Sequence, residues 1–565
     1  MTPEDAQAHI AASDPRFALT EAVIGGVRYP VFANAPAHLR VLLEDAAPAY
    51  GDRDALVYQD ERWRHAELCR EVRRVANALA DDLGVRQGDP VAIAMRNYPE
   101  WMLLYWACVS TGIAVVGMNA WWTAEEMEYA LKDSEPKVLF ADSERLDRVL
   151  SIEGAADRMK IVGVRAPDAP APVIQWADVL AHGGDLPAVR VDPDADACIF
   201  YTSGTTGFPK GAQLTHRGCV SNLLNMAFSG ASTALATQRA TGEVPPEEAP
   251  IPVALITTPL FHVTANNCGA YLVTAAGGKI VLMYRWDAGE ALRLVETEKV
   301  TAMSGVPIMA RELINHPDFE TTDTSSLSTL GGGGAQLPPD LVHKIDSTVA
   351  TARPNTGYGM TETCGIITSV SADFFVDKPD SAGPAMPNFE AKCVNELGET
   401  VPQGEVGELW VRGSSVIKGY INRPEATAES ITDGWLHTGD IARIDEHGFI
   451  FIVDRKKDMV LRGGENVYCA EVEAAIYRHP SVAECSVFGV PDDRLGEEVG
   501  VAVVLKPGED LAAVTLREHC AGIMAKHKVP RYVWFLTALP RNASGKFVKR
   551  DLKEQLTKEL DSAKT

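Results

Sequence analysis

Short apolar runs alternate with amphipathic segments in the first part of the chain. The runs Pro90–Met95, Ala114–Met118 and Lys137–Ala141 have the length and composition of buried strands. Residues 125–132, between the last two runs, are typical of a helix. Strands that alternate with helices indicate parallel sheets with crossover helices. The pattern therefore predicts an α/β fold for this part of the chain.

Two long stretches, residues 101–122 and 251–278, contain no Lys, Arg, Asp or Glu. A membrane span needs about 20 predominantly apolar residues. Both stretches are interrupted by polar residues or prolines: Ser110, Thr111, Asn119, Pro252, Pro259, His262, Asn266 and Asn267. We therefore expect buried helices and core strands here, and no integral membrane association.

The pattern changes beyond Gly404 to short alternating strands, at residues 407–412 and 448–453. The charged cluster Asp454–Asp458 follows, and beyond it a compact α+β segment is predicted. Its expected elements are helix 470–478, strands 484–489 and 499–505, and helix 511–526. A boundary here divides the chain into domains 1–454 and 455–565, with a hinge at about 454–458. The second domain, of about 110 residues, has an ordinary domain size.

Charge and cysteine content narrow the function classes. The 565 residues include 53 basic and 77 acidic side chains, a net charge of −24, which argues against general affinity for nucleic acid or anionic membranes. The ten cysteines form no CxxC pair, and the N-terminus is acidic without an apolar core. These features favour a reducing, cytoplasmic location without a zinc site or disulfide framework. Any bound polyanion must be met by local cations, backbone N–H groups or a metal.

The strongest signal for chemistry is YTSGTTGFPKG at residues 201–211, directly after the apolar run 197–200. Glycines and small hydroxyl residues after a strand leave backbone N–H groups free to face phosphate oxygens. Lys210 adds a mobile positive charge. The spacing is not that of a Walker A loop. A flexible linker would need neither the preceding strand nor the Pro-Lys-Gly ending, so we predict a phosphate-binding loop.

Two further motifs carry weaker signals when each is considered alone. The glycine run at 331–338 is equally consistent with a tight strand-to-helix turn and with a ligand contact. In the segment 355–363, Tyr358 offers a ring for stacking on a base and Thr361 a hydroxyl for phosphate. Glu362 offers a hard oxygen ligand suited to Mg²⁺.

The last two motifs follow in the C-terminal part. Residues 434–440 end in Asp440, which is suited either to accepting ribose hydroxyls or to capping a turn before the next strand. Residues 540–546 end in Lys546. A lone lysine on such a loop is usually solvated, but the four preceding motifs favour a functional role.

Together, YTSGTTGFPKG, GGGGAQLP, YGMTET, GWLHTGD, DRKKDMVLRGGENV and PRNASGK resemble the motifs of the adenylate-forming superfamily, in particular its acyl-CoA synthetases. The resemblance covers about the whole chain. It implies a large N-terminal domain of stacked mixed β-sheets with helices, and a small mobile α+β C-terminal domain. It also implies that a carboxylate attacks the α-phosphate of Mg-ATP, and that the thiol of CoA then displaces AMP from the acyl-adenylate.

The resemblance further implies roles for individual residues. The β- and γ-phosphates are assigned to Ser203, Gly204, Thr205, Thr206, Gly207 and Lys210. Adenine is assigned to Gly333, Gly334, Ala335 and Tyr358, and the neighbouring Thr202 and Gly359 are assigned to nucleotide binding in general. The ribose is assigned to Asp440 and Arg455, the α-phosphate to Thr361, and Mg²⁺ to Glu362.

The remaining implied roles concern the acid and the moving domain. Lys546 bridges the carboxylate and the α-phosphate in the first step, and Lys457 occupies the hinge position. Rotation about the hinge brings Gly463 and Gly464 towards the thiol. His262 lies beside the acyl carboxylate, with an ordinary buried histidine as the alternative.

Residues that follow His262 and Glu362 are small or apolar, which suits a hydrophobic acid. An amino acid would need a buried carboxylate for its amine. We expect a medium- or long-chain fatty acid. Asn266 stands where some long-chain enzymes of the family carry a tryptophan, so aryl and steroid side-chain acids stay open. Free CoA is the simpler thiol, and residues 526–531 offer cations for its phosphates or a solvated basic face.

The expected partners are thus a small carboxylic acid, ATP and CoA, with the chain as a monomer or homodimer. One alternative is an acyl-AMP ligase that loads a carrier protein. Another is a catalytically silent nucleotide- or lipid-binding protein, against which the intact set of Thr361, Glu362, Asp440, Arg455 and Lys546 argues.

Overall fold

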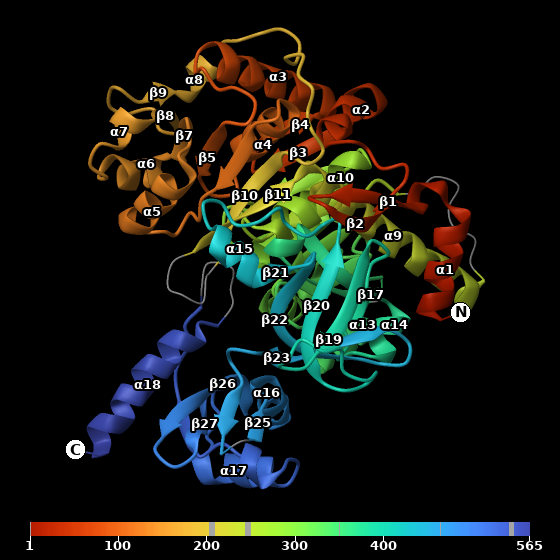
Figure 1. Cartoon of the computed structure of the whole chain (residues 1–565), viewed down its shortest axis with the longest axis vertical. Helices are drawn as coiled ribbons and strands as arrows, with labels where there is room; N and C mark the ends of the chain where they lie inside the picture. Colours follow the sequence, from red (N-terminus) through yellow and green to blue (C-terminus); the bar gives the residue numbers. More distant parts are fainter. Residues whose placement is uncertain are drawn as a thin grey trace. The chain divides into compact units, whose positions relative to one another are not determined.

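The structure is a computed structural model that describes residues 2–202, 209–242, 250–349, 351–463, 465–541 and 547–564 (Figure 1). The chain forms two compact units. The large unit comprises Met1–Glu390 and Val411–Leu436, and the small unit comprises Ala391–Trp410 and His437–Thr565. The predicted α/β class, with several mixed sheets before a smaller α+β part, is confirmed. The predicted hinge at 454–458 stays a prediction.

A seven-stranded sheet of the large unit has the order β11-β10-β6-β5-β7-β8-β9. Its strands are β5 (Pro90–Ala94), β6 (Ala114–Gly117), β7 (Val138–Asp142), β8 (Lys160–Val164), β9 (Ile174–Gln175), β10 (Asp196–Thr202) and β11 (Lys210–Thr215). β10 is parallel to β6 and antiparallel to β11. The predicted strands are confirmed as β5, β6 and β7. The predicted helix is α5 (Ala124–Ser134), which begins with a capping box on Thr123.

An eight-stranded sheet has the order β17-β16-β15-β14-β12-β13-β3-β4. Its strands are β3 (Asp54–Tyr58), β4 (Glu61–Arg64), β12 (Val253–Ile256), β13 (Lys279–Leu282), β14 (Ala302–Gly305), β15 (Thr329–Gly333), β16 (Arg353–Met360) and β17 (Gly365–Ser371). β12, β14, β15 and β16 are mutually parallel. Their carboxyl ends therefore lie along one edge of the sheet.

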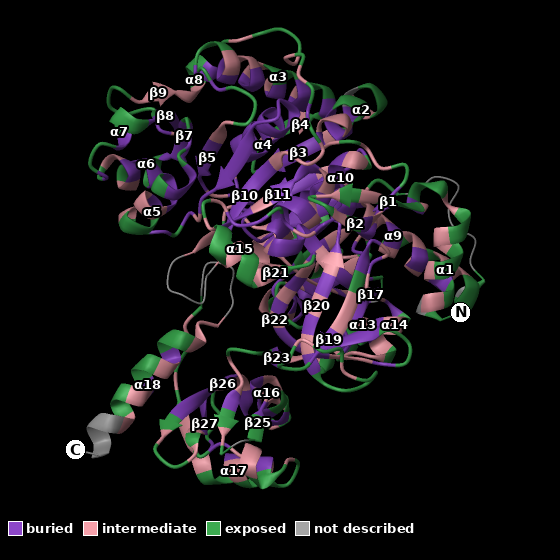
Figure 2. Cartoon of the chain, viewed as in Figure 1, coloured by how far each residue is buried: buried purple, intermediate pink, exposed green. Residues whose placement is uncertain are grey.

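Helix α4 (Pro99–Ser110) lies between the two sheets. It packs against β5, β6 and β10 of the first sheet and β3 of the second. All of its residues are buried, as Figure 2 shows in purple, and a helix that is covered on every side is apolar all round. The expectation of a buried helix and a core strand for 101–122 is confirmed. No helix among the described residues combines the length and the hydropathy that a membrane crossing requires.

The second charge-free stretch, 251–278, is also built into the core. It begins with β12 and continues through a π-helix, η2 (Thr264–Ala270), into α10 (Tyr271–Ala275). π-helical turns are rare and are frequent at functional sites. Asn266 and Asn267, two of the polar residues that interrupt this stretch, therefore lie in a helix of unusual geometry, which the sequence pattern does not reveal.

In the small unit, β22 (Trp435–Ile444) pairs with β23 (Phe449–Arg455). A further sheet has the order β25-β24-β27-β26, with β28 (Tyr532–Phe535) beside β27. Its other strands are β24 (Val460–Arg462), β25 (Glu465–Val467), β26 (Val482–Asp492) and β27 (Gly496–Leu505), and its helices are α16 (Cys469–Tyr477), α17 (Ala513–Ala521) and α18 (Lys549–Lys564). The helix predicted to reach residue 526 is shorter: α17 ends at Ala521, and the next residue, Gly522, has a low helix propensity.

A buried carboxylate joins β23 to α16. Asp454 accepts hydrogen bonds from the backbone N–H of Arg455, at 2.7 Å, and of Cys469. Lys549 of α18 is paired with Glu473 of α16 at 2.8 Å. Burial raises the pKa of Asp454 from its ordinary 3.8 to about 6, although Lys549 and the two N–H groups act in the opposite direction. The folded chain therefore holds this proton more tightly than the unfolded chain does.

Asp454→Asn should change the pH dependence of stability. Because the folded pKa of Asp454 lies above the unfolded one, its contribution to the free energy of unfolding is present below pH 4 and is lost as the pH rises towards about 6. Relative to the wild type, the variant should gain about 1 to 3 kcal/mol over this interval. Thermal unfolding midpoints measured at several pH values test this. The exposed Asp510→Asn is the control, and parallel profiles for wild type and Asp454→Asn would contradict the expectation.

Candidate active site

The carboxyl edge of the eight-stranded sheet gathers the residues predicted to frame adenine. The register places Gly333 of β15 opposite Gly357 of β16, one residue before Tyr358. Gly334 follows β15 with φ +78, and it and Ala335 are exposed. The first three glycines of the run therefore belong to strand β15, and the chain turns only at Gly334. The tight turn considered for the whole run is thus confined to its second half.

Gly359 has a packing reason to be glycine. A Cβ at this position would collide with the backbone carbonyl of Gly365 on the neighbouring strand β17. The β16–β17 register shifts between Tyr358 and Gly359, and the strands stay paired beyond the shift, with Gly359 opposite Ile366. The assignment of Gly359 to nucleotide binding stays a prediction beside this structural role.

The phosphate-binding motif is described only at its two ends. Ser203, Gly204, Thr205, Thr206 and Gly207 lie outside the described residues. Thr202 ends β10 and Lys210 begins β11, and these two residues are register partners in the antiparallel pair. The strand predicted before the motif is confirmed, whereas the return strand β11 was not expected from the sequence.

Glu362 and Lys210 meet through a tyrosine that the motifs did not indicate. The hydroxyl of Tyr420 donates a hydrogen bond to Oε1 of Glu362 at 2.9 Å. The ammonium of Lys210 lies 5.0 Å from the centre of the same ring. Burial, and then the Glu362 charge, raise the pKa of Tyr420, so its hydroxyl stays a donor. The only hint in the sequence is its position directly after Gly419 in a turn-rich segment.

The turn that carries Thr361 and Glu362 is tied to the π-helix that follows His262. This turn is η4 (Thr361–Thr363), in which Glu362 is buried and Thr361 is half-buried. The Asn267 side-chain amide donates to the carbonyl of Cys364 at 2.9 Å. The N–H of Asn266 donates to the carbonyl of His262 at 3.0 Å. The two segments predicted to line the acyl pocket are therefore neighbours.

Buried amide atoms without hydrogen-bond partners lie on two elements of this region. Neither amide atom of Asn225, on α9 (His216–Thr241), has a hydrogen-bond partner among the described residues. Oδ1 of Asn266 also has no hydrogen-bond partner among the residues that the structure describes. One turn from Asn225, Asn222 donates to the carbonyl of Asn267 at 3.3 Å and accepts from the N–H of Ile366 at 2.9 Å. Buried polar groups without partners are rare and call for an explanation.

The small unit brings the two predicted ribose residues together. Asp440 and Arg455 are register partners in β22 and β23, with 3.5 Å between Arg455 Nε and Asp440 Oδ1. The carboxylate is buried and the guanidinium is half-exposed. Asp440 lies inside β22, so the alternative of a cap before the next strand is wrong. The N–H of Asp440 donates to Thr438 Oγ1 at 3.1 Å.

The other predicted residues of this unit lie on loops. Lys457 is exposed, just beyond β23. Gly463 turns from β24 to β25 with φ +60, and its N–H donates to the carbonyl of Leu495 at 2.7 Å. Gly464 and Lys546 lie outside the described residues. Arg541 and Phe547, which flank the Lys546 segment, form an isolated β-bridge.

The donors present fit a magnesium ion that is held mainly by a nucleotide. No group of three or more His, Cys, Asp or Glu side chains that would enclose a metal occurs among the described residues. Mg²⁺ usually takes one or two carboxylates together with phosphates and waters. Glu362 provides one carboxylate, and only its Oε1 accepts a hydrogen bond from a described residue.

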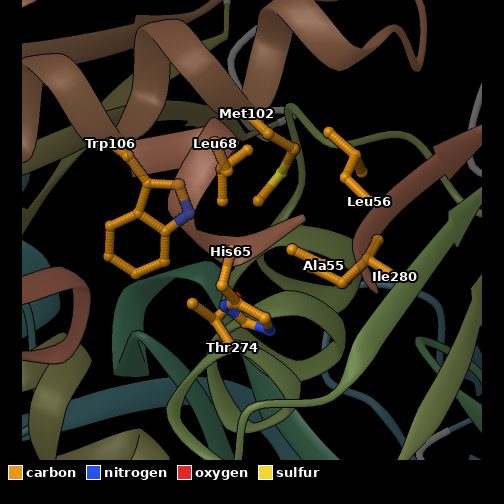
Figure 3. Close-up of a pocket in the computed structure, with 8 residues that line it drawn as sticks. All are labelled: Ala55, Leu56, His65, Leu68, Met102, Trp106, Thr274 and Ile280. Atoms are coloured by element: carbon orange, nitrogen blue, oxygen red, sulfur yellow. The ribbon is translucent and has the colours of Figure 1, made fainter. Parts of the chain in front are cut away.

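A small cavity elsewhere in the large unit is apolar and contains none of the predicted site residues (Figure 3). Eight residues line it: Ala55, Leu56, His65, Leu68, Met102, Trp106, Thr274 and Ile280. Burial lowers the pKa of His65, whose Nε2 bonds the carbonyl of Gly278 at 3.1 Å. The neutral histidine therefore has a structural role here.

Comparison with known proteins places this geometry in a family. The model of the AMP-binding enzyme family matches residues 43–421, and that of the AMP-binding enzyme C-terminal domain matches residues 471–546. The chain is 38% identical to a feruloyl-CoA synthase of an Amycolatopsis species, over 87% of this chain and 93% of the relative. It is 32% identical to a mitochondrial medium-chain acyl-CoA ligase of Mus musculus, over 95% and 91% of the two chains.

Solved structures that resemble this chain belong to the same kind of enzyme. An anthranilate CoA ligase in complex with anthranoyl-AMP matches with a TM-score of 0.81 at 26% identity, over 93% of this chain and 98% of that chain. ATP-bound MatB from Rhodopseudomonas palustris matches with a TM-score of 0.80 at 31% identity, over 92% and 99%. The chain therefore belongs to the AMP-binding enzyme family, within the adenylate-forming superfamily, and is of the acyl-CoA synthetase type.

Proposed function

We propose that the chain joins a hydrophobic carboxylic acid to CoA through an acyl-adenylate, with release of AMP and pyrophosphate. What supports the proposal is the edge of the eight-stranded sheet, where the parallel strands β15 and β16 end side by side. The 333–335 turn lies at the end of β15, Tyr358 lies near the end of β16, and Glu362 lies in the turn that follows β16. Ligands of open α/β sheets bind at such an edge. The family membership adds the reaction class.

The first step opposes two anions, because a carboxylate attacks a phosphate. Local cations and hydrogen-bond donors must therefore neutralise charge within a chain of net charge −24. Lys210 serves the β- and γ-phosphates, and Thr361 donates its hydroxyl to the α-phosphate. Glu362 would hold Mg²⁺, which supplies positive charge to the phosphates when it is bound. Lys546 bridges the acid and the α-phosphate.

The small unit binds the ribose of the nucleotide, and its rotation switches the enzyme from adenylation to thioester formation. The Asp440 carboxylate accepts hydrogen bonds from the ribose hydroxyls, while Arg455 keeps that carboxylate oriented. After adenylation, rotation about Lys457 withdraws Lys546 and brings the loop at Gly463 and Gly464 to the thiol. Such motion between half-reactions separates adenylation from thioester formation.

The acid is proposed to be a medium- or long-chain fatty acid, with an aryl acid as the second candidate. Small and apolar residues after Glu362 suit an alkyl chain. The amide of Asn225 and Oδ1 of Asn266, which lack partners among the described residues, favour the second candidate, because they can bond a ring hydroxyl or methoxy group. A relative that is 38% identical is named as a feruloyl-CoA synthase.

A panel of acids tests both candidates. Acetate, octanoate, palmitate, cinnamate, ferulate and a steroid side-chain acid are incubated with ATP, Mg²⁺ and CoA, and AMP and acyl-CoA are quantified. We expect AMP and acyl-CoA in equal amounts for one class of acid. ADP as product would contradict the adenylation mechanism, and pyrophosphate without acyl-CoA would favour the ligase that loads a carrier protein.

Asn225→Leu tests whether the Asn225 amide bonds a ring substituent of an aryl acid. If its amide bonds a ring substituent, the variant should raise the KM for ferulate relative to cinnamate by about ten-fold, because a buried hydrogen bond to the substrate is lost. Ser232→Ala is the matched control, since it removes from the same helix another buried polar group, a hydroxyl, that has no described partner. An equal change for ferulate and cinnamate would contradict a bond between Asn225 and a ring substituent.

Lys546→Ala should abolish adenylation yet leave thioester formation from supplied acyl-adenylate largely intact. The lysine is needed only where the acid meets the α-phosphate, so its loss should lower the first half-reaction by about 100-fold or more. Pyrophosphate exchange measures the first step, and acyl-CoA formed from synthetic acyl-adenylate measures the second. Lys506→Ala, which removes an exposed lysine of the same unit, is the control. Equal loss of both steps would contradict the assignment.

A further inference from the structure

Tyr420 connects an anion and a cation that the proposed function assigns to the same nucleotide. Its hydroxyl donates to Oε1 of Glu362 at 2.9 Å, and its ring lies 5.0 Å from Nζ of Lys210. Both Tyr420 and Glu362 are only 8% exposed. One buried side chain therefore contacts two groups that come from different sheets.

The backbone of the Tyr420 segment is fixed to the strand that carries Lys210. The N–H of Ile421 donates to the carbonyl of Gly211 at 2.8 Å, and the N–H of Gln213 donates to the carbonyl of Gly419 at 2.9 Å. Tyr420 itself forms an isolated antiparallel bridge with Ala212. The segment thus extends the edge of the seven-stranded sheet next to β11.

The same segment is fixed to the turn that carries Glu362. The N–H of Ile417 donates to the backbone carbonyl of Glu362 at 3.0 Å. The N–H of Tyr420 donates to Thr427 Oγ1 at 2.9 Å, which closes the segment on the start of α15 (Pro424–Ser430). The Tyr420 segment is therefore fixed both to β11 and to the turn that carries Glu362. This fixes the direction from which the Tyr420 hydroxyl donates to the Glu362 carboxylate.

A third attachment lies near the end of β10, at the first residue of the phosphate-binding motif. Arg423 pairs with the buried Asp133 at 3.2 Å, and the hydroxyl of Tyr201 donates to the same carboxylate at 3.0 Å. Tyr201 and Tyr420 are alike, because each is a buried tyrosine that donates to a buried carboxylate. Only Tyr420 donates to a proposed metal ligand.

A single carboxylate that serves a metal must present one oxygen in a fixed direction. Hydrogen bonds to the other oxygen supply that orientation, and such outer partners tune metal affinity. Among the described residues, Tyr420 is the donor to Oε1 of Glu362, and none of them donates to Oε2. The arrangement leaves Oε2 for the ion.

We propose that Tyr420 is a positioning residue that aims Oε2 of Glu362 at the Mg²⁺ of the bound nucleotide. Its ring also places the ammonium of Lys210 near the phosphates. This inference rests on the proposed function, which makes Glu362 the metal ligand. A merely structural hydroxyl would satisfy the buried carboxylate and stabilise the fold, but its loss would not change how much Mg²⁺ strengthens nucleotide binding.

Tyr420→Phe tests the proposal, since it removes the hydroxyl and keeps the ring beside Lys210. Isothermal titration calorimetry measures the Kd of ATP with Mg²⁺ and with EDTA, without acid or CoA. The ratio of the two values is the metal enhancement. We expect the variant to lose about ten-fold of this enhancement, as for a hydrogen bond to a charged group. Its Kd for metal-free ATP should stay unchanged.

Two further variants complete the design. Tyr105→Phe is the matched control, because it removes the hydroxyl of another buried tyrosine, which bonds the Tyr271 hydroxyl and not a carboxylate, and its metal enhancement should equal that of the wild type. Glu362→Gln should lose the enhancement, and adding Tyr420→Phe to it should cost nothing more, because the two residues act as one unit.

Thr427→Val keeps the test open if Tyr420→Phe does not fold. It leaves Tyr420 and Glu362 in place but removes the hydroxyl that accepts from the N–H of Tyr420, so the metal enhancement should fall in the same direction. An unchanged enhancement in Tyr420→Phe, or equal weakening of ATP binding with and without metal, would overturn the proposal. If Glu362→Gln keeps the full enhancement, the metal assignment of the proposed function fails instead.

Discussion

The parallel pairing of β12, β14, β15 and β16 is the constraint on which the rest of the site depends. It fixes the carboxyl ends of four strands along one edge, so that segments far apart in the sequence become neighbours. The pairing is close enough to demand glycine: a Cβ at Gly331 would collide with Asn355 of the next strand. The buried helix α4 supports the sheet from one face, since it fills the space between the two sheets.

An acidic protein that binds small polyanions must concentrate its few cations where the phosphates lie. A net charge of −24 is therefore compatible with the binding of a small polyanion at one site. Dissolved salt screens the repulsion from carboxylates that lie more than about 10 Å away. Arg455 pairs with a buried aspartate, and Lys210 lies over an aromatic ring. Each cation is thereby fixed in place by the fold before a ligand arrives.

Several elements follow from local pattern alone. The strands β5, β6 and β7, the helix α5 and the elements of the C-terminal segment were predicted from apolar runs and helix-forming stretches, because burial on a sheet or helix imposes a period on the sequence. The pattern predicts a helix up to residue 526, whereas α17 ends at Ala521, because glycine at 522 is a poor helix former. The π-helix after His262 leaves no periodic signal, and the attachment of residues 417–421 to β11 depends on contacts between residues about 200 positions apart.

The sequence by itself determined the class of fold, the order of the motifs and the chemistry that their side chains offer. Those properties are local: a glycine-rich turn, a hard carboxylate or a lysine is readable wherever it occurs. Only the tertiary structure decided which groups meet. It paired Asp440 with Arg455 inside a sheet, placed the π-helix beside Thr361 and Glu362, and set Tyr420 between Glu362 and Lys210. Such contacts arise from the register and packing of whole elements, and no short stretch of sequence encodes them.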